Sequence, residues 1–170
     1  MFRSKRFVTS RVNGWGMIMT VPFKPVFENE SDAANERRIA DFLERKYTVR
    51  LVRQKKFAQF DFMACKGDEI KAFVEMRCQS KPHDQFPTVM VTVTKLIAAK
   101  HMIELINVPH YFCVEWSDGV IAMTDLRGFL QNNADIRILP NCENRRNSPD
   151  DLEPVAYIPF SKFKVLQEKQ

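Results

Sequence analysis

No stretch of this sequence is apolar for long enough to cross a bilayer as a helix. Such a helix needs about 20 consecutive apolar residues, and the longest apolar-leaning stretches, residues 102–108 and 111–116, are shorter and contain acidic residues. The 170 residues are 45% hydrophobic and 28% charged, and 14 of them are phenylalanine. We therefore expect one water-soluble domain, with no membrane partner, whose core needs no disulfide or metal.

Metal-binding cysteine pairs are also missing. Cys65, Cys78, Cys113 and Cys142 are widely spaced, and the sequence holds no CxxC pair and no paired Cys/His spacing. A structural zinc site is therefore not expected. Cys65 and Cys78 lie in apolar segments and are expected to be small buried residues in a protein of the reducing cytoplasm. The P-loop, GxSxG and dinucleotide-binding fingerprints are absent as well.

Acidic residues are absent from residues 1–27, although the chain as a whole has a net charge of +5 and a pI of about 9.1. The basic residues of this segment are Arg3, Lys5, Arg6, Arg11 and Lys24. A basic N-terminal segment of residues 1–30 is typical of an arm that lies along a polyanion such as DNA. A solvated terminus has the same composition, and a cleaved targeting segment is a third interpretation.

Helical and extended patterns alternate along the rest of the chain. The expected elements, in order, are a helix (31–46), three strands (47–54, 57–65 and 70–79), a helix (94–107) and two strands (110–116 and 119–126). Val89–Val93 is either extended or the entrance to the second helix, and a short helix is expected at 125–132. A polar loop at 140–154 and an edge strand formed by VAYIPF and FKVL complete the chain. This order predicts an α/β fold, with a mixed sheet of at least four strands and a helix on each face.

The strand at residues 70–79 carries the candidate chemistry. Because side chains alternate along a strand, Val74, Met76 and Cys78 share the core face, and the opposite face carries Phe73, Glu75, Arg77 and Gln79. On the preceding strand, Asp61 stands between two phenylalanines, where an acid is costly unless it is paired or binds a cation. A hairpin closed near Gly67 would bring Asp61 close to Glu75. The two carboxylates could then share one divalent ion, for which their hard oxygen donors suit Mg²⁺.

This arrangement resembles the PD-(D/E)XK phosphodiesterase family, over roughly residues 30–125. The family pattern is an acid on the second strand, followed fourteen residues later by Glu-x-Lys on the third, and here the corresponding residues are Asp61 and Glu75-Met76-Arg77. The matching pieces are Asp61 in QFDFMA and Glu75 in FVEMRCQ, and the chain is similar to compact members carried by phages and prophages. The resemblance implies a restriction-endonuclease-like core at residues 31–132, with residues 133–170 as a C-terminal loop and edge strand of the same domain.

The resemblance also implies an activity, which is metal-dependent hydrolysis of DNA phosphodiesters by an endonuclease or exonuclease. Asp61, Glu75 and the backbone carbonyl of Met76 would hold Mg²⁺, for which Mn²⁺ would be a substitute. Glu36 in the first helix matches an accessory acid that binds a second ion or orients water, although an exposed helix acid paired with neighbouring cations fits it too. Members of the family often dimerise to cut two strands, so a homodimer is one expected assembly.

The sequence departs from the family pattern at one position, where Arg77 replaces the lysine. Arginine keeps the charge but cannot act as a general base, and Lys95, at the start of the second helix, is a candidate replacement. Gln79 could contact the substrate. The alternative is a catalytically inactive relative that binds DNA or a protein partner, and a plain interaction domain is a third hypothesis. Among the three histidines, only His83 is expected near the site.

Overall fold

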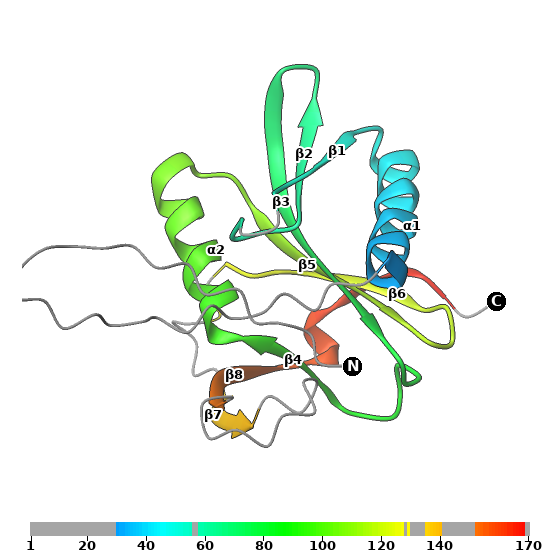
Figure 1. The fold of residues 1–170 in the computed structure, drawn as a ribbon, viewed down its shortest axis with the longest axis vertical. Coiled ribbons are helices and arrows are strands. Elements are labelled where there is room, and N and C mark those ends of the chain that lie inside the picture. Colours follow the sequence, from blue (N-terminus) through cyan, green and yellow to red (C-terminus); the bar gives the residue numbers. More distant parts are fainter. Residues whose placement is uncertain (1–29, 56–57, 128, 130–134, 141–151, 169–170) are drawn as a thin grey trace, which may run out of the picture.

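The computed structural model describes residues 30–55, 58–127, 129, 135–140 and 152–168 (Figure 1). The basic N-terminal segment lies outside these residues, apart from Glu30, as do much of the short helix expected at 125–132 and most of the polar loop expected at 140–154. None of the described helices is both long enough and apolar enough to span a membrane.

The described elements form two sheets and two α-helices. In chain order they are α1 (Glu30–Tyr47), β1 (Arg50–Arg53), β2 (Phe62–Lys66), β3 (Glu69–Gln79), β4 (Thr88–Thr92), α2 (Val93–Ile106), β5 (His110–Trp116), β6 (Ile121–Asp125), β7 (Asp135–Pro140), β8 (Leu152–Pro159) and β9 (Lys164–Gln167). The main sheet has six strands in the order β1-β2-β3-β5-β6-β9, and the smaller sheet has the order β4-β8-β7. The expected α/β fold with a mixed central sheet is therefore confirmed, with six strands instead of the minimum of four.

The long strand β3 lies in the middle of the main sheet and has a different partner on each side. It pairs antiparallel with β2 through a tight turn in which Gly67 adopts a φ of 61°, a conformation that glycine reaches without strain. On its other edge β3 pairs in parallel with β5, with Glu75 opposite Phe112. A parallel pair requires a crossover connection, and the segment that contains β4 and α2 provides it.

Both faces of the main sheet are covered, because α1 and α2 lie on opposite sides of it (Figure 1). On one face, Ile39, Ala40 and Leu43 of α1 pack on Phe62, Val74 and other sheet residues. The second core contains α2, β4 and β8 with Phe112, Val114 and Trp116 of β5. The prediction of one helix on each side is confirmed, and the face of β3 that carries Glu75 is covered as well.

Several local predictions need correction. The second strand begins at Phe62 instead of residue 57. The ambiguous segment Val89–Val93 is extended as far as Thr92, in β4, and Val93 begins α2. The VAYIPF segment belongs to β8, which is the middle strand of the smaller sheet and not an edge strand, whereas FKVL contributes β9 at an edge of the main sheet. Cys65 is buried as expected, but Cys78, near the end of β3, is exposed.

Truncation of Phe112 should test how much the second core contributes to stability. The Phe112 side chain is 1% exposed, so Phe112→Ala leaves a cavity and should lower the free energy of unfolding by about 3–5 kcal/mol. Urea denaturation followed by circular dichroism measures the change. Leu105→Ala is the matched control, because Leu105 is 76% exposed and its truncation should change stability by at most about 0.5 kcal/mol. Equal effects of the two substitutions would contradict this packing.

Candidate active site

Glu75 lies in the middle of β3, and its side chain is only 13% exposed. The alternation along β3 places Glu75, Arg77 and Gln79 on the face that carries β4 and α2, while Val74 and Met76 face α1. A carboxylate in this position loses most of its hydration when the protein folds, so neighbouring groups must compensate for that loss.

Asp61 reaches Glu75 from the residue that precedes β2. The last regular pair of the hairpin is Phe62 with Val74, and one further step along the same register leads to Asp61 and Glu75. The backbone N–H of Asp61 donates to the carbonyl of Val74 at 3.2 Å. Its carboxylate Oδ2 accepts a hydrogen bond from the N–H of Met76 at 2.7 Å. Asp61 is thus fixed against the edge of β3 just beyond the end of β2.

Met76 presents its backbone carbonyl to the same edge of the strand. In an extended strand the N–H and C=O of one residue point to the same side, and the N–H of Met76 is the one that binds Asp61. The carboxylates of Asp61 and Glu75 and the carbonyl of Met76 therefore form a group of oxygen atoms at one point of the sheet.

Lys95 brings a positive charge to this group. It is the third residue of α2, and its Nζ lies 2.6 Å from Oε2 of Glu75 and 3.9 Å from Oδ1 of Asp61. Its side chain is 26% exposed, so the ammonium is partly shielded from water and its interaction with the carboxylates is stronger than at an open surface. The structure thus brings together Asp61, Glu75 and Lys95.

The pKa of Glu75 is raised from 4.5 to about 8. Burial is the largest cause, and the negative charge of Asp61 adds to it, while Lys95 acts in the opposite direction. A single ammonium therefore does not fully offset the burial of Glu75 beside a second acid. An additional cation at this point would favour the ionised carboxylate.

A polar pocket of about 300 Å³ opens next to the three charged residues. Its lining residues are Glu36, Arg53, Gln54, Lys55, Ala58, Phe60, Asp61 and Lys95. Glu36 comes from α1, and its carboxylate accepts a hydrogen bond from Arg53 at 2.9 Å. Glu36 therefore borders the same pocket as Asp61 and is paired with Arg53 of β1.

Arg77 and Gln79 lie further along β3. The guanidinium of Arg77 donates to the backbone carbonyl of Met90 at 2.8 Å, so this side chain connects β3 to β4. Gln79 lines a different pocket, together with Met90 and Trp116. The structure therefore brings Lys95 into contact with Glu75 and uses Arg77 to connect β3 with β4.

His110 is a neighbour of the site that the sequence pattern did not indicate. It is fully buried, and its ring packs against Phe60 and Phe73, with centroid distances of 6.0 and 6.1 Å. Burial, with a further contribution from Lys95, lowers the pKa of His110 to about 4. His83, the histidine expected near the site, instead bonds Asp118 at 2.7 Å. The sequence pattern indicated only that His110 begins a strand after Pro109. That prediction concerns the fold and not the active site.

The donor set at Asp61, Glu75 and Met76 fits a hard divalent cation. It offers two carboxylates and a carbonyl, the oxygen ligands that Mg²⁺ prefers, and burial together with the charge of Asp61 raises the pKa of Glu75, which a bound cation would counteract. Among the described residues, the one trio of His, Cys, Asp or Glu with ligand atoms within 4.8 Å is His83, Asp84 and Asp118. Glu36 therefore does not complete an equally compact trio with the two acids.

The sheet, its two covering helices and the acids at β2 and β3 define the PD-(D/E)XK nuclease class. The chain belongs to the family described as "Phage putative PDDEXK endonuclease", whose model matches residues 22–166. The match extends beyond the expected core of residues 31–132 and includes β8 and most of β9.

A solved structure supports the same fold. The chain is similar to Archaeoglobus fulgidus Hjc, a Holliday junction resolvase from an archaeal hyperthermophile, with a TM-score of 0.51. The likeness covers 79% of this chain and 90% of Hjc, at 10% sequence identity, and at that identity it shows the fold alone. No curated protein matches the sequence.

The raised pKa of Glu75 predicts how stability depends on pH in the metal-free protein. Between about pH 4.5 and 8 the folded state keeps a proton that the unfolded state has lost. Stability from this group is therefore complete below pH 4.5 and falls as pH rises toward 8, by at most about 1.4 kcal/mol per pH unit. Glu75→Gln, which cannot lose this proton, should match the wild type near pH 5 and melt at a higher temperature above pH 8.

Thermal melts in EDTA from pH 5 to 9 measure this difference. Glu104→Gln is the control, because the Glu104 side chain on α2 is 58% exposed and its change should leave the pH profile unaltered. Parallel profiles for wild type and Glu75→Gln would show that Glu75 does not hold a proton in the folded state.

Proposed function

We propose that this protein is a DNA nuclease that depends on a divalent metal, with its active site at Asp61, Glu75 and Lys95. The observation that carries the proposal is the position of Lys95, whose ammonium lies 2.6 Å from Glu75 and 3.9 Å from Asp61. The family pattern has a lysine two residues after the glutamate, and Arg77 stands there instead. Lys95, which comes from α2, brings a lysine ammonium to the same two carboxylates and would take the place of the family's lysine.

Each residue has a chemical task in this proposal. Asp61, Glu75 and the Met76 carbonyl would hold Mg²⁺ or Mn²⁺, which when bound polarises the phosphate and makes a water molecule more acidic. Lys95 would stabilise negative charge on the phosphate as the bond breaks. Unlike an arginine, it can also lose its proton and act as a base. Glu36 would orient water or bind a second ion from the other side of the pocket.

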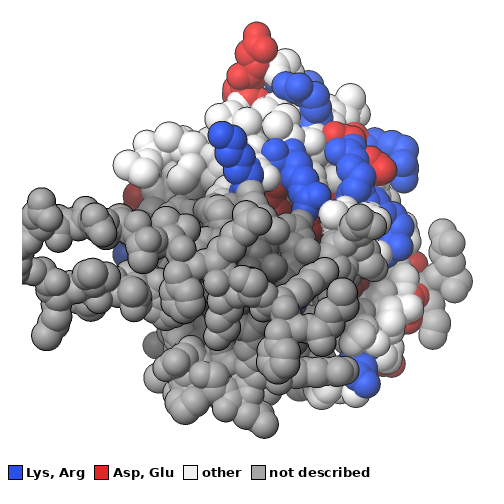
Figure 2. All heavy atoms as spheres, in the orientation of Figure 1, with Lys and Arg blue, Asp and Glu red and all other residues white. Residues whose placement is uncertain are grey.

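Two exposed cations that line the pocket, Arg53 and Lys55, support DNA as the substrate. Lysine and arginine side chains gather on one face of the molecule, over α1, β1 and the β2–β3 hairpin (Figure 2). The exposed cations of β1 and the hairpin, with Lys55, are Arg50, Arg53, Lys55, Lys66 and Lys71. Positive charge at the pocket and on the same face of the molecule attracts the phosphate backbone toward the acidic site.

The proposal also includes a cellular location and an assembly state. The described cysteines Cys65, Cys78 and Cys113 are free thiols, as expected in the reducing cytoplasm where we propose that the protein acts. A homodimer, which would present two sites to two strands, stays a prediction. A relative that binds DNA without cutting it is the alternative that the experiments below separate from a nuclease.

Removal of either carboxylate or of Lys95 should stop cleavage. Asp61→Asn and Glu75→Gln remove negative charge from the metal ligands, and Lys95→Met removes the ammonium. Each should lower the single-turnover cleavage rate with Mg²⁺ by about a hundredfold or more. The rates are measured on radiolabelled single-stranded, duplex and branched DNA, with EDTA as the metal-free reference.

Lys100→Met is the matched control for Lys95→Met. Lys100 lies on the same helix but is 46% exposed and pairs only loosely with Glu104, at 3.7 Å, so its loss should change the rate less than threefold. Salt-sensitive binding without cleavage of any of these DNAs, in Mg²⁺ and in Mn²⁺, would refute the nuclease and favour the alternative.

Substitution of Arg77 by lysine tests whether position 77 or Lys95 supplies the lysine that cleavage requires. Because the Arg77 guanidinium is engaged by the carbonyl of Met90, Arg77→Lys should change the cleavage rate by no more than a few-fold. It should lower stability by about 1 kcal/mol, since one hydrogen bond between β3 and β4 weakens. A cleavage rate raised tenfold or more in Arg77→Lys would instead assign the lysine role to position 77.

A further inference from the structure

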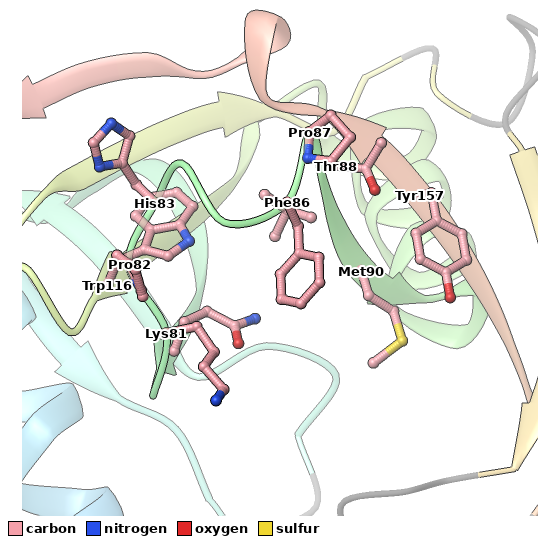
Figure 3. Close-up of a pocket in the computed structure, with 11 residues that line it drawn as sticks. Lys81, Pro82, His83, Phe86, Pro87, Thr88, Met90, Trp116 and Tyr157 are labelled. Carbon is pink, nitrogen blue, oxygen red and sulfur yellow. The ribbon is translucent and has the colours of Figure 1, made fainter.

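A second pocket, of about 270 Å³, lies at the far end of β3 from Asp61. It is formed by the loop between β3 and β4 together with residues of β4, β5 and β8 (Figure 3). Its lining residues are Gln79, Lys81, Pro82, His83, Phe86, Pro87, Thr88, Val89, Met90, Trp116 and Tyr157. None of these residues is acidic.

Aromatic rings dominate this pocket. Phe86 points from the loop into the space between Lys81 and Met90, with Tyr157 on the opposite wall (Figure 3). Its side chain is 56% exposed, although burial of a phenylalanine ring would stabilise the protein by about 1.5–3 kcal/mol. A large exposed ring at the mouth of a pocket offers a stacking surface for another flat group.

The loop that carries Phe86 is fixed at several points. His83 bonds Asp118 at 2.7 Å, and the backbone N–H of Ser117 donates to the carbonyl of Lys81 at 3.2 Å. The N–H of Phe160 donates to the carbonyl of Pro87 at 2.9 Å. The pocket is therefore formed in advance, so a ligand would not have to order the loop.

The pocket and the candidate active site share one face of one strand. Glu75, Arg77 and Gln79 follow each other at two-residue steps, so Gln79 lies about 13 Å from Glu75 at about 3.3 Å per residue. A DNA strand advances about 3.4 Å per nucleotide in a duplex, and more when it is stretched. A strand whose phosphate lies at Glu75 would therefore place a base at the pocket two to four nucleotides away.

We infer that this pocket binds one unpaired nucleobase of the DNA strand that is cut, so that the substrate class is DNA with unpaired bases beside the scissile phosphate. The base would stack on Phe86, the Gln79 amide would bond its polar edge, and Lys81 would meet a flanking phosphate. A paired base is stacked within its duplex and cannot enter the pocket unless it is extruded. This inference rests on the proposed function, because it takes its DNA strand from that site.

Removal of single bases tests the inference without any need for cleavage. The probe is a fluorescein-labelled duplex with a single-stranded extension, and one abasic site at a time is placed along the extension. Binding is measured in EDTA by fluorescence anisotropy. For the wild type we expect affinity to fall about tenfold when the abasic site occupies one position or two adjacent positions, and to change little elsewhere.

Variants of Phe86 assign this effect to the pocket. Phe86→Ala should weaken binding of the intact probe about tenfold and remove the penalty of the abasic site, whereas Phe86→Trp should keep both. Leu105→Ala, which removes another exposed apolar side chain from the protein, is the control and should behave as the wild type. Because the Phe86 side chain is more than half exposed, its variants should fold normally, which thermal melts verify.

Two outcomes would overturn the inference. The first is an abasic penalty that is spread evenly along the strand, and the second is a penalty that persists in Phe86→Ala. Affinity that depends on salt alone would show contacts to the backbone only, and would also overturn it. If DNA binds with a penalty localised at Phe86 but Mg²⁺ and Mn²⁺ support no cleavage, the nuclease proposal fails while the base pocket stands.

Discussion

A carboxyl group in the middle of a strand that is covered on both faces must either be compensated by positive charge or keep its proton, and much of this structure is arranged around that requirement. Glu75 is held between Asp61 and Lys95, and the one cation does not cancel both burial and the second acid. Lys95 reaches Glu75 only because α2 packs on the sheet through Leu96, Ala98 and Ala99. The charge balance of the site therefore depends on the packing of the crossover between β3 and β5, and site and fold form together.

The parts of the molecule that depend on local patterns could be predicted from the sequence. The amphipathic stripe predicted the helix α1, and the glycine turn predicted that β2 and β3 form a hairpin. The helical spacing of apolar residues before Pro109 predicted the crossover helix α2. These elements were enough to place Asp61 near Glu75. The sequence left undecided whether Lys95 contacts Glu75. Lys95 comes twenty positions after Glu75 and reaches it only because a helix packs on the sheet.

The parts that depend on contacts between distant segments could not be predicted. The smaller sheet joins β4 to β8, strands more than 60 residues apart, and nothing in the local pattern of VAYIPF specifies that partner. His110 and Phe60 meet for the same reason. The pocket around Phe86 combines three separate stretches of the chain, residues 79–90, Trp116 and Tyr157, and in the sequence its loop is simply polar and rich in proline.

The β2–β3 ladder contains one irregularity, a shift of register between Ala64 and Cys65, and this shift has a consequence for sequence comparison. A hairpin closed by two residues, here Gly67 and Asp68, pairs residues whose separation in the chain is an odd number. Asp61 and Glu75 are fourteen apart, an even number, and the shift between Ala64 and Cys65 leaves one residue of β3 without a partner. That extra residue changes the parity and aligns the two acids. A relative with the same turn and no bulge would need a spacing of thirteen, so a search for this acid should follow strand register and not a fixed residue count.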